Sequence, residues 1–235
     1  MDSIKLGTLL GDKLYKLAKE EDVKICLEVG TADGKSSSYC IAKGLKESGG
    51  LLFTFEADLD IMKKAINNLK QYNFPVFFLH GSALPLGYLK DWEQYAQEIN
   101  TSKYLPSTLL PEMERRYNGQ KQYYSQKNAS SLIDLCNYIT FFDLVFLDGG
   151  TFTSYDEMLF LQNKITKYLI LDDTNPENGG RKNVKTRIEL LNSENWDVLE
   201  DHYENRTGWM LLKRRINGHP VKKKSGKKDT ARLKK

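Results

Sequence analysis

Two adjacent carboxylates, Asp172 and Asp173, directly follow an apolar run in the stretch "YLILDDTN". Two unit charges about 4 Å apart repel each other by roughly 4 kcal/mol at an effective dielectric near 20. At the end of a buried strand such a pair needs a compensating partner, which could be solvent, a proton, a cationic side chain or a metal ion. A third carboxylate, Asp148, ends another apolar run, "FDLVFLD".

These three carboxylates would meet if the two apolar runs were neighbouring parallel strands, because neighbouring strand ends lie within roughly 5 Å of each other. Three converging carboxylates favour a hard divalent cation such as Mg²⁺, which takes oxygen ligands and keeps positions open for water and substrate. The competing interpretation is a set of solvated strand ends in which Asp173 caps the segment that follows.

A glycine-containing turn, "LEVGTADGKSS", carries a second group of candidate residues. Glu28 ends the preceding strand, and Gly30 and Gly34 allow the backbone to turn tightly and to approach a ligand. Ser36 begins a helix whose first NH groups lack intrahelical partners. A second acid, Glu56, ends the next apolar run, where it is the expected partner of a ribose diol in nucleotide-type sites.

Short apolar runs alternate with helical patterns along most of the chain, which predicts an α/β fold with a parallel sheet covered by helices on both faces. The expected strands are 23–29, 51–56, 75–79, 142–148 and 168–173. The expected helices are an amphipathic one within 1–22, then 36–47, 58–70, one opened by the capping-box spacing of Ser154 and Glu157, and 183–191. The runs 196–200 and 208–214 predict a closing hairpin.

Residues 85–138, which we call the insertion, interrupt this alternation and contain seven tyrosines. More than fifty residues is too long for a structureless loop in a compact domain, so we expect a partly helical segment. It lies between the third and fourth strands, at the sheet edge where ligands bind in this class of fold. Two interpretations stay open: a substrate lid, or an elaborated surface that serves as a dimer contact.

The charge is distributed unevenly. The chain has 35 Lys and Arg and 31 Asp and Glu, but 11 of the basic residues and only one acid lie from Lys213 onward. The rest of the chain therefore has 24 basic and 30 acidic residues, a net charge of −6. We expect one domain over 1–214 and a disordered basic tail over 215–235, which either solubilises the protein or contacts nucleic acid or an anionic surface.

Membrane and secretory signals are missing from the sequence. No segment approaches the roughly 20 apolar residues of a membrane span, and the first residues lack the continuous apolar region of a signal peptide. Three scattered cysteines are too few for a disulfide framework or a zinc site. These features predict a cytoplasmic setting.

The spacing E-x-G-x-x-x-G in the glycine turn resembles the class I S-adenosylmethionine-dependent methyltransferases over residues 24–214. The resemblance implies a Rossmann-like, doubly wound, seven-stranded sheet that is parallel except for an antiparallel strand in the C-terminal hairpin. It implies S-adenosylmethionine as cofactor, with its methionine part near Glu28, Gly30, Thr31 and Gly34, and with Ser36 and Asp148 as further cofactor-binding residues. By the same resemblance Glu56 binds the ribose hydroxyls, and Ser82 stands where the family often has an acid facing adenine. The alternative is a structural turn in another α/β fold.

The combination "LDGG…YDEM…LILDDTN" is similar to the metal-dependent O-methyltransferases, and closest to the cephalosporin-hydroxylase-like branch. This likeness implies that Asp148, Asp172 and Asp173 are catalytic residues that ligate Mg²⁺. The ion would bind two substrate oxygens and lower the pKa of the attacked hydroxyl. Thr151 stands where sugar-modifying members often have a histidine base. None of His80, His202 and His219 is a convincing substitute, so Lys182 and the insertion tyrosines remain candidates.

The expected function is therefore Mg²⁺-assisted O-methylation of a hydroxyl on a sugar, a glycan or another small molecule, by a protein that could form homo-oligomers. Two alternatives stay open: an RNA methyltransferase that uses the basic tail, and an inactive cofactor-binding module. Arg181 and Lys182 either meet an anionic substrate or are solvated charges at a helix start.

Overall fold

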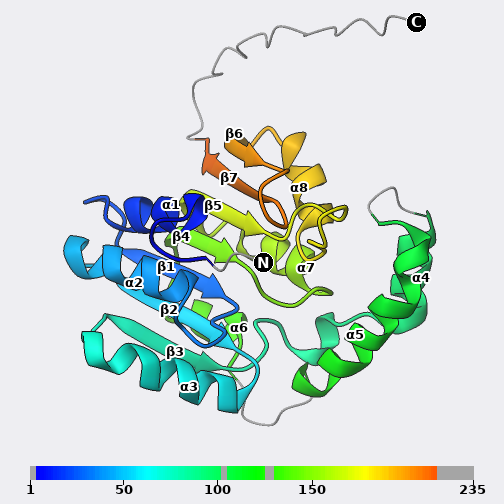
Figure 1. Cartoon of the computed structure of the whole chain (residues 1–235), viewed down its shortest axis with the longest axis horizontal. Coiled ribbons are helices and arrows are strands. Elements are labelled where there is room, and N and C mark those ends of the chain that lie inside the picture. Colours follow the sequence, from blue (N-terminus) through cyan, green and yellow to red (C-terminus); the bar gives the residue numbers. More distant parts are fainter. Residues whose placement is uncertain (1–3, 102–104, 125–129, 216–235) are drawn as a thin grey trace, which may run out of the picture.

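A single sheet of seven strands forms the centre of the protein (Figure 1). The computed structural model describes residues 4–101, 105–124 and 130–215. The strand order across the sheet is β3-β2-β1-β4-β5-β7-β6. The strands are β1 (Ile25–Val29), β2 (Leu51–Glu56), β3 (Val76–His80), β4 (Phe142–Leu147), β5 (Ile165–Asp172), β6 (Trp196–His202) and β7 (Trp209–Arg214).

Strand direction follows the prediction. The pairs β2–β3, β1–β2, β1–β4 and β4–β5 are parallel, whereas β7 is antiparallel to both β5 and β6. The chain first winds from β1 outward to β3 and then returns to β4 on the other side of β1. In open α/β sheets this reversal of winding leaves a crevice at the carboxyl ends of the two central strands, where ligands bind.

Helices cover both faces of the sheet. Outside the insertion they are α1 (Leu9–Ala18), α2 (Ser37–Ser48), α3 (Leu59–Leu69), α7 (Ser154–Leu161) and α8 (Val184–Leu191), with a short 3-10 helix η1 (Lys70–Tyr72). Buried side chains of α1 and α2 pack on one face, around Cys26 and Ile170. Those of α6 (Leu132–Cys136), α7 and α8 pack on the other, around Leu27 and Leu169. Because the central strands are buried on both faces, they have the continuous apolar runs seen in the sequence.

The insertion is largely helical in its described part. It contains η2 (Leu86–Tyr88), α4 (Trp92–Thr101), η3 (Ser107–Leu109), α5 (Leu110–Tyr124) and α6. Helices α4 and α5 pack through Tyr95, Ile99, Met113 and Tyr117, and this small core also holds Phe152 from the loop after β4. Figure 1 shows α4 and α5 beyond the arrowheads of the central strands, at the carboxyl edge of the sheet.

Two predictions about helix starts had different outcomes. Asp58 caps α3 as expected for a helix over 58–70, since its Oδ1 accepts hydrogen bonds from the NH groups of Asp60 (2.9 Å) and Ile61 (3.0 Å). The capping box predicted for Ser154 and Glu157 is wrong. Ser154 already lies inside α7 and donates its hydroxyl to the carbonyl of Gly150 at 2.6 Å, so it cannot act as the cap.

Parts of the predicted tail and of the insertion lie outside the described residues. Residues 216–235 of the tail lie outside the described residues, as does Tyr104 of the insertion. Within the described part of the chain, no helix is both long enough and apolar enough to cross a membrane.

A capping box that the sequence analysis missed opens α6. The NH of Asp134 donates to Ser131 Oγ (3.2 Å), and the NH of Ser131 donates to Asp134 Oδ2 (3.1 Å). We predict that Ser131→Ala lowers the free energy of unfolding by about 1 kcal/mol, because an NH of the first turn loses its acceptor. Urea denaturation of the unliganded protein measures this change.

The matched control is Ser36→Ala. Ser36 also precedes a helix, α2, but its side chain makes no capping hydrogen bond. This variant should stay within about 0.5 kcal/mol of wild type. Equal losses in the two variants would contradict the role of the Ser131 cap.

Candidate active site

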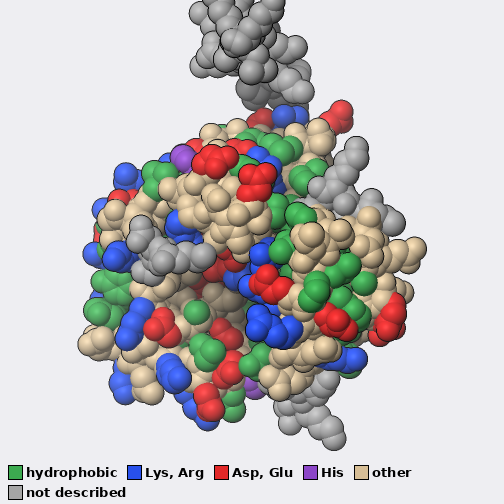
Figure 2. Space-filling view, turned by 45° about the vertical axis from the view of Figure 1, so that its right-hand side comes forward, with side chains coloured by type: hydrophobic (Ala, Val, Ile, Leu, Met, Phe, Trp, Pro, Cys, Tyr) green, Lys and Arg blue, Asp and Glu red, His purple; other side chains and the backbone are tan. Residues whose placement is uncertain are grey.

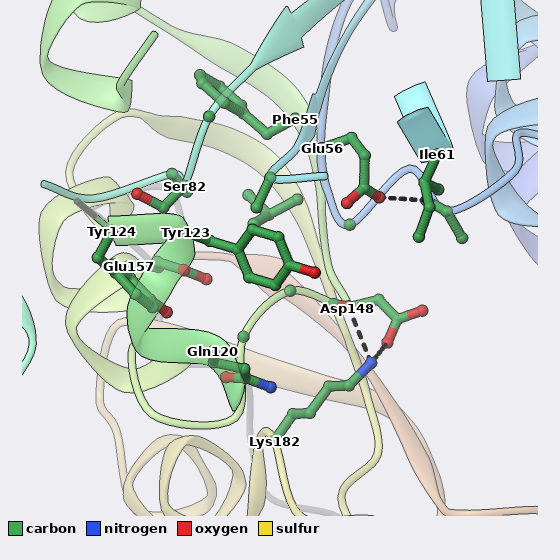
Figure 3. Close-up of a pocket in the computed structure, with 18 residues that line it drawn as sticks. Phe55, Glu56, Ile61, Ser82, Gln120, Tyr123, Tyr124, Asp148, Glu157 and Lys182 are labelled. Carbon is green, nitrogen blue, oxygen red and sulfur yellow. Dashed lines mark hydrogen bonds and ion pairs between the residues drawn. The ribbon is translucent and has the colours of Figure 1, made fainter. Parts of the chain in front are cut away.

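A cavity of about 300 Å³ lies at the carboxyl ends of β1 to β4. Figure 2 shows this face of the molecule hollowed, with acidic and basic side chains together at the hollow. Figure 3 shows the side chains that line the cavity, which come from the strand-end loops, the insertion helix α5, helix α7 and the loop before α8. Four of the predicted cofactor residues are among them: Gly30, Glu56, Ser82 and Asp148.

The turn after β1 is held against β2 and β4. Gly30 has φ of +102°, and a Cβ there would lie 2.4 Å from the carbonyl oxygen of Asp148, so only glycine permits this approach. The NH of Gly30 donates to the carbonyl of Phe55 at 3.0 Å. The NH of Asp148 donates to the carbonyl of Val29 at 2.9 Å. The three strand ends thus form one continuous wall of the cavity.

Glu28 lies behind this wall, outside the cavity lining. It is fully buried, and its Oε2 accepts hydrogen bonds from Ser38 Oγ (2.5 Å) and Thr54 Oγ1 (2.6 Å). Burial raises the pKa of Glu28 to about 7. Thr31 is also buried, with its hydroxyl 2.5 Å from that of Thr54. Both residues therefore fix the shape of the turn.

The other two residues predicted from the glycine turn also lie outside the lining. Gly34, at φ +76°, packs against α3, where a Cβ would lie 3.1 Å from side-chain atoms of Ala65 and Leu69. Ser36 is half-buried at the start of α2 and uses its side chain for no capping bond. A cofactor role for Glu28, Thr31, Gly34 and Ser36 stays a prediction.

Glu56 is positioned by two backbone groups at the end of β2. Its Oε2 accepts from the NH of Ala32 at 2.9 Å, and its Oε1 accepts from the NH of Asp58 at 3.0 Å. Burial raises the pKa of this carboxyl above its ordinary value. Across the cavity, Ser82 donates its hydroxyl to the carbonyl of Leu84 at 2.8 Å, which leaves its oxygen free to accept a hydrogen bond.

Helix α5 closes the cavity with Gln120, Tyr123 and Tyr124. The Tyr123 hydroxyl donates to Asp58 Oδ2 at 3.1 Å, and the Tyr124 hydroxyl lies 2.9 Å from Thr153 Oγ1. The tyrosine-rich composition of the insertion pointed to this segment. Nothing in the sequence distinguished these residues from the other insertion tyrosines.

Glu157 is the lining residue that the sequence analysis misassigned. It is 1% exposed, and Thr153 Oγ1 donates to its Oε1 at 2.7 Å. Its Oε2 is buried without a hydrogen-bond partner among the described residues, and so is Gln120 Oε1. Burial raises the pKa of Glu157 to about 7. Two unpartnered acceptors in one cavity suit a ligand that carries N–H donors.

The predicted acid cluster is present, but cationic side chains neutralise it. Lys182 Nζ lies 2.5 Å from Asp148 Oδ1 and 3.2 Å from Asp173 Oδ2, and it donates to the Asp148 carbonyl at 3.0 Å (Figure 3). Arg206 Nη2 lies 3.1 Å from Asp172 Oδ2. The compensating partners that the sequence left open are therefore a lysine and an arginine.

The pKa values of this cluster follow from burial and charge. Burial, with the nearby carboxylate of Asp148, raises the pKa of Asp172 to about 7 despite Arg206. Burial also raises the pKa of Asp148, and the ammonium of Lys182 opposes that shift. For Lys182, burial lowers the pKa, but Asp148 and Asp173 raise it more, so the net shift is upward.

The three aspartates do not fit a Mg²⁺ site in this arrangement. Within residues 4–101, 105–124 and 130–215, no group of three or more His, Cys, Asp or Glu side chains is arranged to hold a metal ion. Lys182 occupies the space between Asp148 and Asp173, and Arg206 covers Asp172.

A second cavity, of about 90 Å³, lies on the other side of Lys182. Its wall includes Tyr95 from α4, Phe152 from the loop after β4, and Tyr155 from α7. Thr151, which stands at the expected histidine position, lines it and has a buried hydroxyl without a partner among the described residues. Lys182 lines both cavities, so its side chain separates them.

The two described histidines lie outside both cavity linings. His80 ends β3, and His202 stacks on Trp209 with ring centroids 4.1 Å apart. Neither lines either of these two cavities. His219 lies outside the described residues. The histidine base of the sugar-modifying enzymes has no counterpart in either wall.

Comparisons with known proteins agree with this architecture. No protein-family model matches the chain, and no curated protein matches it in sequence. Cofactor-bound Rv0187 from MTB is 17% identical, with 92% of this chain and 84% of that one covered at a TM-score of 0.58. The S-adenosylhomocysteine-bound methyltransferase PaMTH1 from Podospora anserina is 13% identical. The match covers 92% of this chain and 80% of that one, with a TM-score of 0.56.

The O-methyltransferase from Bacillus cereus, also bound to S-adenosylhomocysteine, is 16% identical. The match covers 91% of this chain and 84% of that one, with a TM-score of 0.56. At such identities the likeness establishes the fold. Together with the sheet order, it confirms the predicted Rossmann-like fold of the class I methyltransferases.

The buried carboxyl of Glu157 should make the stability of the protein depend on pH. Its raised pKa means that the folded chain holds a proton that the unfolded chain releases between about pH 4.5 and 7. The free energy of unfolding therefore falls as pH rises through this window, by up to roughly 3 kcal/mol from this residue. Glu157→Gln should remove that part of the slope in urea denaturation of the unliganded protein.

The raised pKa values of Glu28 and Asp172 also make the free energy of unfolding fall as pH rises. Glu157→Gln should therefore retain a weaker pH dependence of stability. An exposed carboxylate on α5, Glu114, provides the matched control as Glu114→Gln. An unchanged slope in Glu157→Gln would show that folding does not raise the pKa of this carboxyl.

Proposed function

We propose that this protein is an S-adenosylmethionine-dependent O-methyltransferase. The observation that carries the proposal is the cavity at the carboxyl ends of β1 to β4, which is lined by Glu56 and by Glu157 and Gln120, whose buried oxygens have no partner among the described residues. Its volume of about 300 Å³ is at the lower end of the range for small-molecule sites. The shared fold of methyltransferases solved with cofactor supports the same function.

The cavity offers a suitable group for each part of the cofactor. Glu56 is held by two backbone NH groups in a position to accept hydrogen bonds from the ribose hydroxyls. Ile61 supplies an apolar surface for the nucleoside. Glu157 Oε2 and Gln120 Oε1 can accept from amino groups, which the cofactor carries at both its methionine and adenine ends. When bound, S-adenosylmethionine supplies a methyl group that is already activated by its sulfonium.

The second cavity is the proposed acceptor site, on the far side of Lys182. The rings of Tyr95, Phe152 and Tyr155 line it, and such side chains stack on both sugars and aromatic rings. A sugar, glycan or other small molecule with a hydroxyl group therefore remains the proposed substrate. With an activated methyl donor, the main task of these walls is to orient the hydroxyl and exclude water.

Asp148 is the proposed proton acceptor, because it lines the cofactor cavity and touches the lysine that also lines the acceptor cavity. The sequence led us to expect that Mg²⁺ assists the reaction. This alternative is less favoured, because Lys182 and Arg206 already pair with the aspartates that would bind the ion. An RNA methyltransferase is less favoured, since the chain before Lys213 has a net charge of −6.

Ligand binding tests the proposal. We expect S-adenosylhomocysteine at about 100 times its Kd to raise the melting temperature by roughly 5 to 10 °C, and NADH to have no effect. Glu56→Gln should weaken S-adenosylhomocysteine binding at least about tenfold, because a neutral amide is a weaker acceptor for the ribose hydroxyls. Isothermal titration calorimetry measures this loss.

Glu47→Gln is the matched control, since this carboxylate lies on the surface and pairs with Lys19 far from the cavity. It should bind S-adenosylhomocysteine as wild type does. Stabilisation by NADH but not by S-adenosylhomocysteine would overturn the cofactor assignment. A Glu56→Gln variant with wild-type affinity would remove Glu56 from the site.

A further inference from the structure

The ammonium group of Lys182 has the surroundings that a metal ion would have. Its three nearest oxygen partners are the Asp148 carboxylate, the Asp148 carbonyl and the Asp173 carboxylate, at 2.5, 3.0 and 3.2 Å. An ammonium has three N–H donors, so these three oxygens use all of them. Carboxylate and carbonyl oxygens are also the ligands that hard divalent cations prefer.

From this geometry we infer that Lys182 is a built-in substitute for a divalent cation: it occupies the cation position between Asp148 and Asp173, and the protein works without Mg²⁺. The inference deepens the proposed methyl-transfer function, on which its catalytic part rests. Lys182 acts as a positioning residue here, since it holds both strand-end carboxylates and separates the two cavities.

The backbone around Lys182 is anchored on both sides. The side-chain amide of Asn183 donates to the carbonyls of Leu147 (2.9 Å) and Asp172 (2.8 Å), which ties the start of α8 to the ends of β4 and β5. Arg181, on the other side, pairs with Glu112 of α5 at 2.5 Å. These contacts hold the segment that carries Lys182 beside the ends of β4 and β5.

The charge balance also disfavours an added metal ion. The cluster carries three negative charges when Asp148, Asp172 and Asp173 are all ionised. It also contains two positive charges, on Lys182 and Arg206. A divalent cation at Asp148 and Asp173 would have to displace the ammonium or lie next to it. Either event costs electrostatic free energy in this partly buried setting.

Removing the ammonium should convert the cluster into a metal site. We expect wild-type protein, studied without cofactor or substrate, to leave the electron paramagnetic resonance signal of free Mn²⁺ unchanged at about 1 mM protein and metal. Lys182→Met keeps much of the aliphatic side chain but frees the oxygens, so it should bind one Mn²⁺ with a Kd below about 1 mM. Lys182→Arg retains the positive charge and should bind none.

The double variant Lys182→Met with Asp148→Asn is the matched control for the location of the ion, and it should lose the acquired binding. The acquired Mn²⁺ should also raise the melting temperature of Lys182→Met, and EDTA should reverse the rise. Because these readouts use the metal alone, they are independent of whether S-adenosylhomocysteine binds.

Binding of one Mn²⁺ by the wild-type protein, lost in Asp148→Asn, would overturn the inference. A folded Lys182→Met variant that binds no Mn²⁺ would overturn it as well. If that variant fails to fold, the wild-type titration alone decides between the two outcomes.

Discussion

The pairing of three strand-end carboxylates with Lys182 and Arg206 is the interaction on which the rest of the site depends. Lys182 joins the end of β4 to Asp173, directly after β5, and Arg206 joins Asp172, the last residue of β5, to the loop between β6 and β7. Without these cations the ends of β4 and β5 would repel each other at the place where the two cavities meet. The same contacts therefore stabilise the sheet edge and shape the site.

Two parts of the fold form opposite walls of the first cavity. The strand-end turns form a rigid wall, in which Gly30 approaches Asp148 closely and Glu56 is fixed by backbone NH groups. The insertion forms the opposite wall through α5, whose tyrosines bond to Asp58 and Thr153. A cofactor in the first cavity and an acceptor in the second would meet at Lys182.

The sequence predicted the fold well because buried parallel strands produce continuous apolar runs and because strand-end residues have fixed places in such a sheet. Four of the residues predicted to bind the cofactor, Gly30, Glu56, Ser82 and Asp148, line the cavity at these strand ends. The pairing of Lys182 with Asp148 spans 34 residues and depends on the loop before α8, whose course no periodicity specifies. Glu157 was missed because its spacing from Ser154 matched a helix cap, while its burial depends on tertiary packing.

A crystal structure grown with S-adenosylhomocysteine and excess MgCl₂ is the most direct test of the central claim. We expect the nucleoside at Glu56, and we expect Lys182 Nζ within hydrogen-bonding distance of Asp148 and Asp173, with no Mg²⁺ between them. An octahedral Mg²⁺ bound to Asp148, Asp172 and Asp173, with Lys182 turned away, would contradict it.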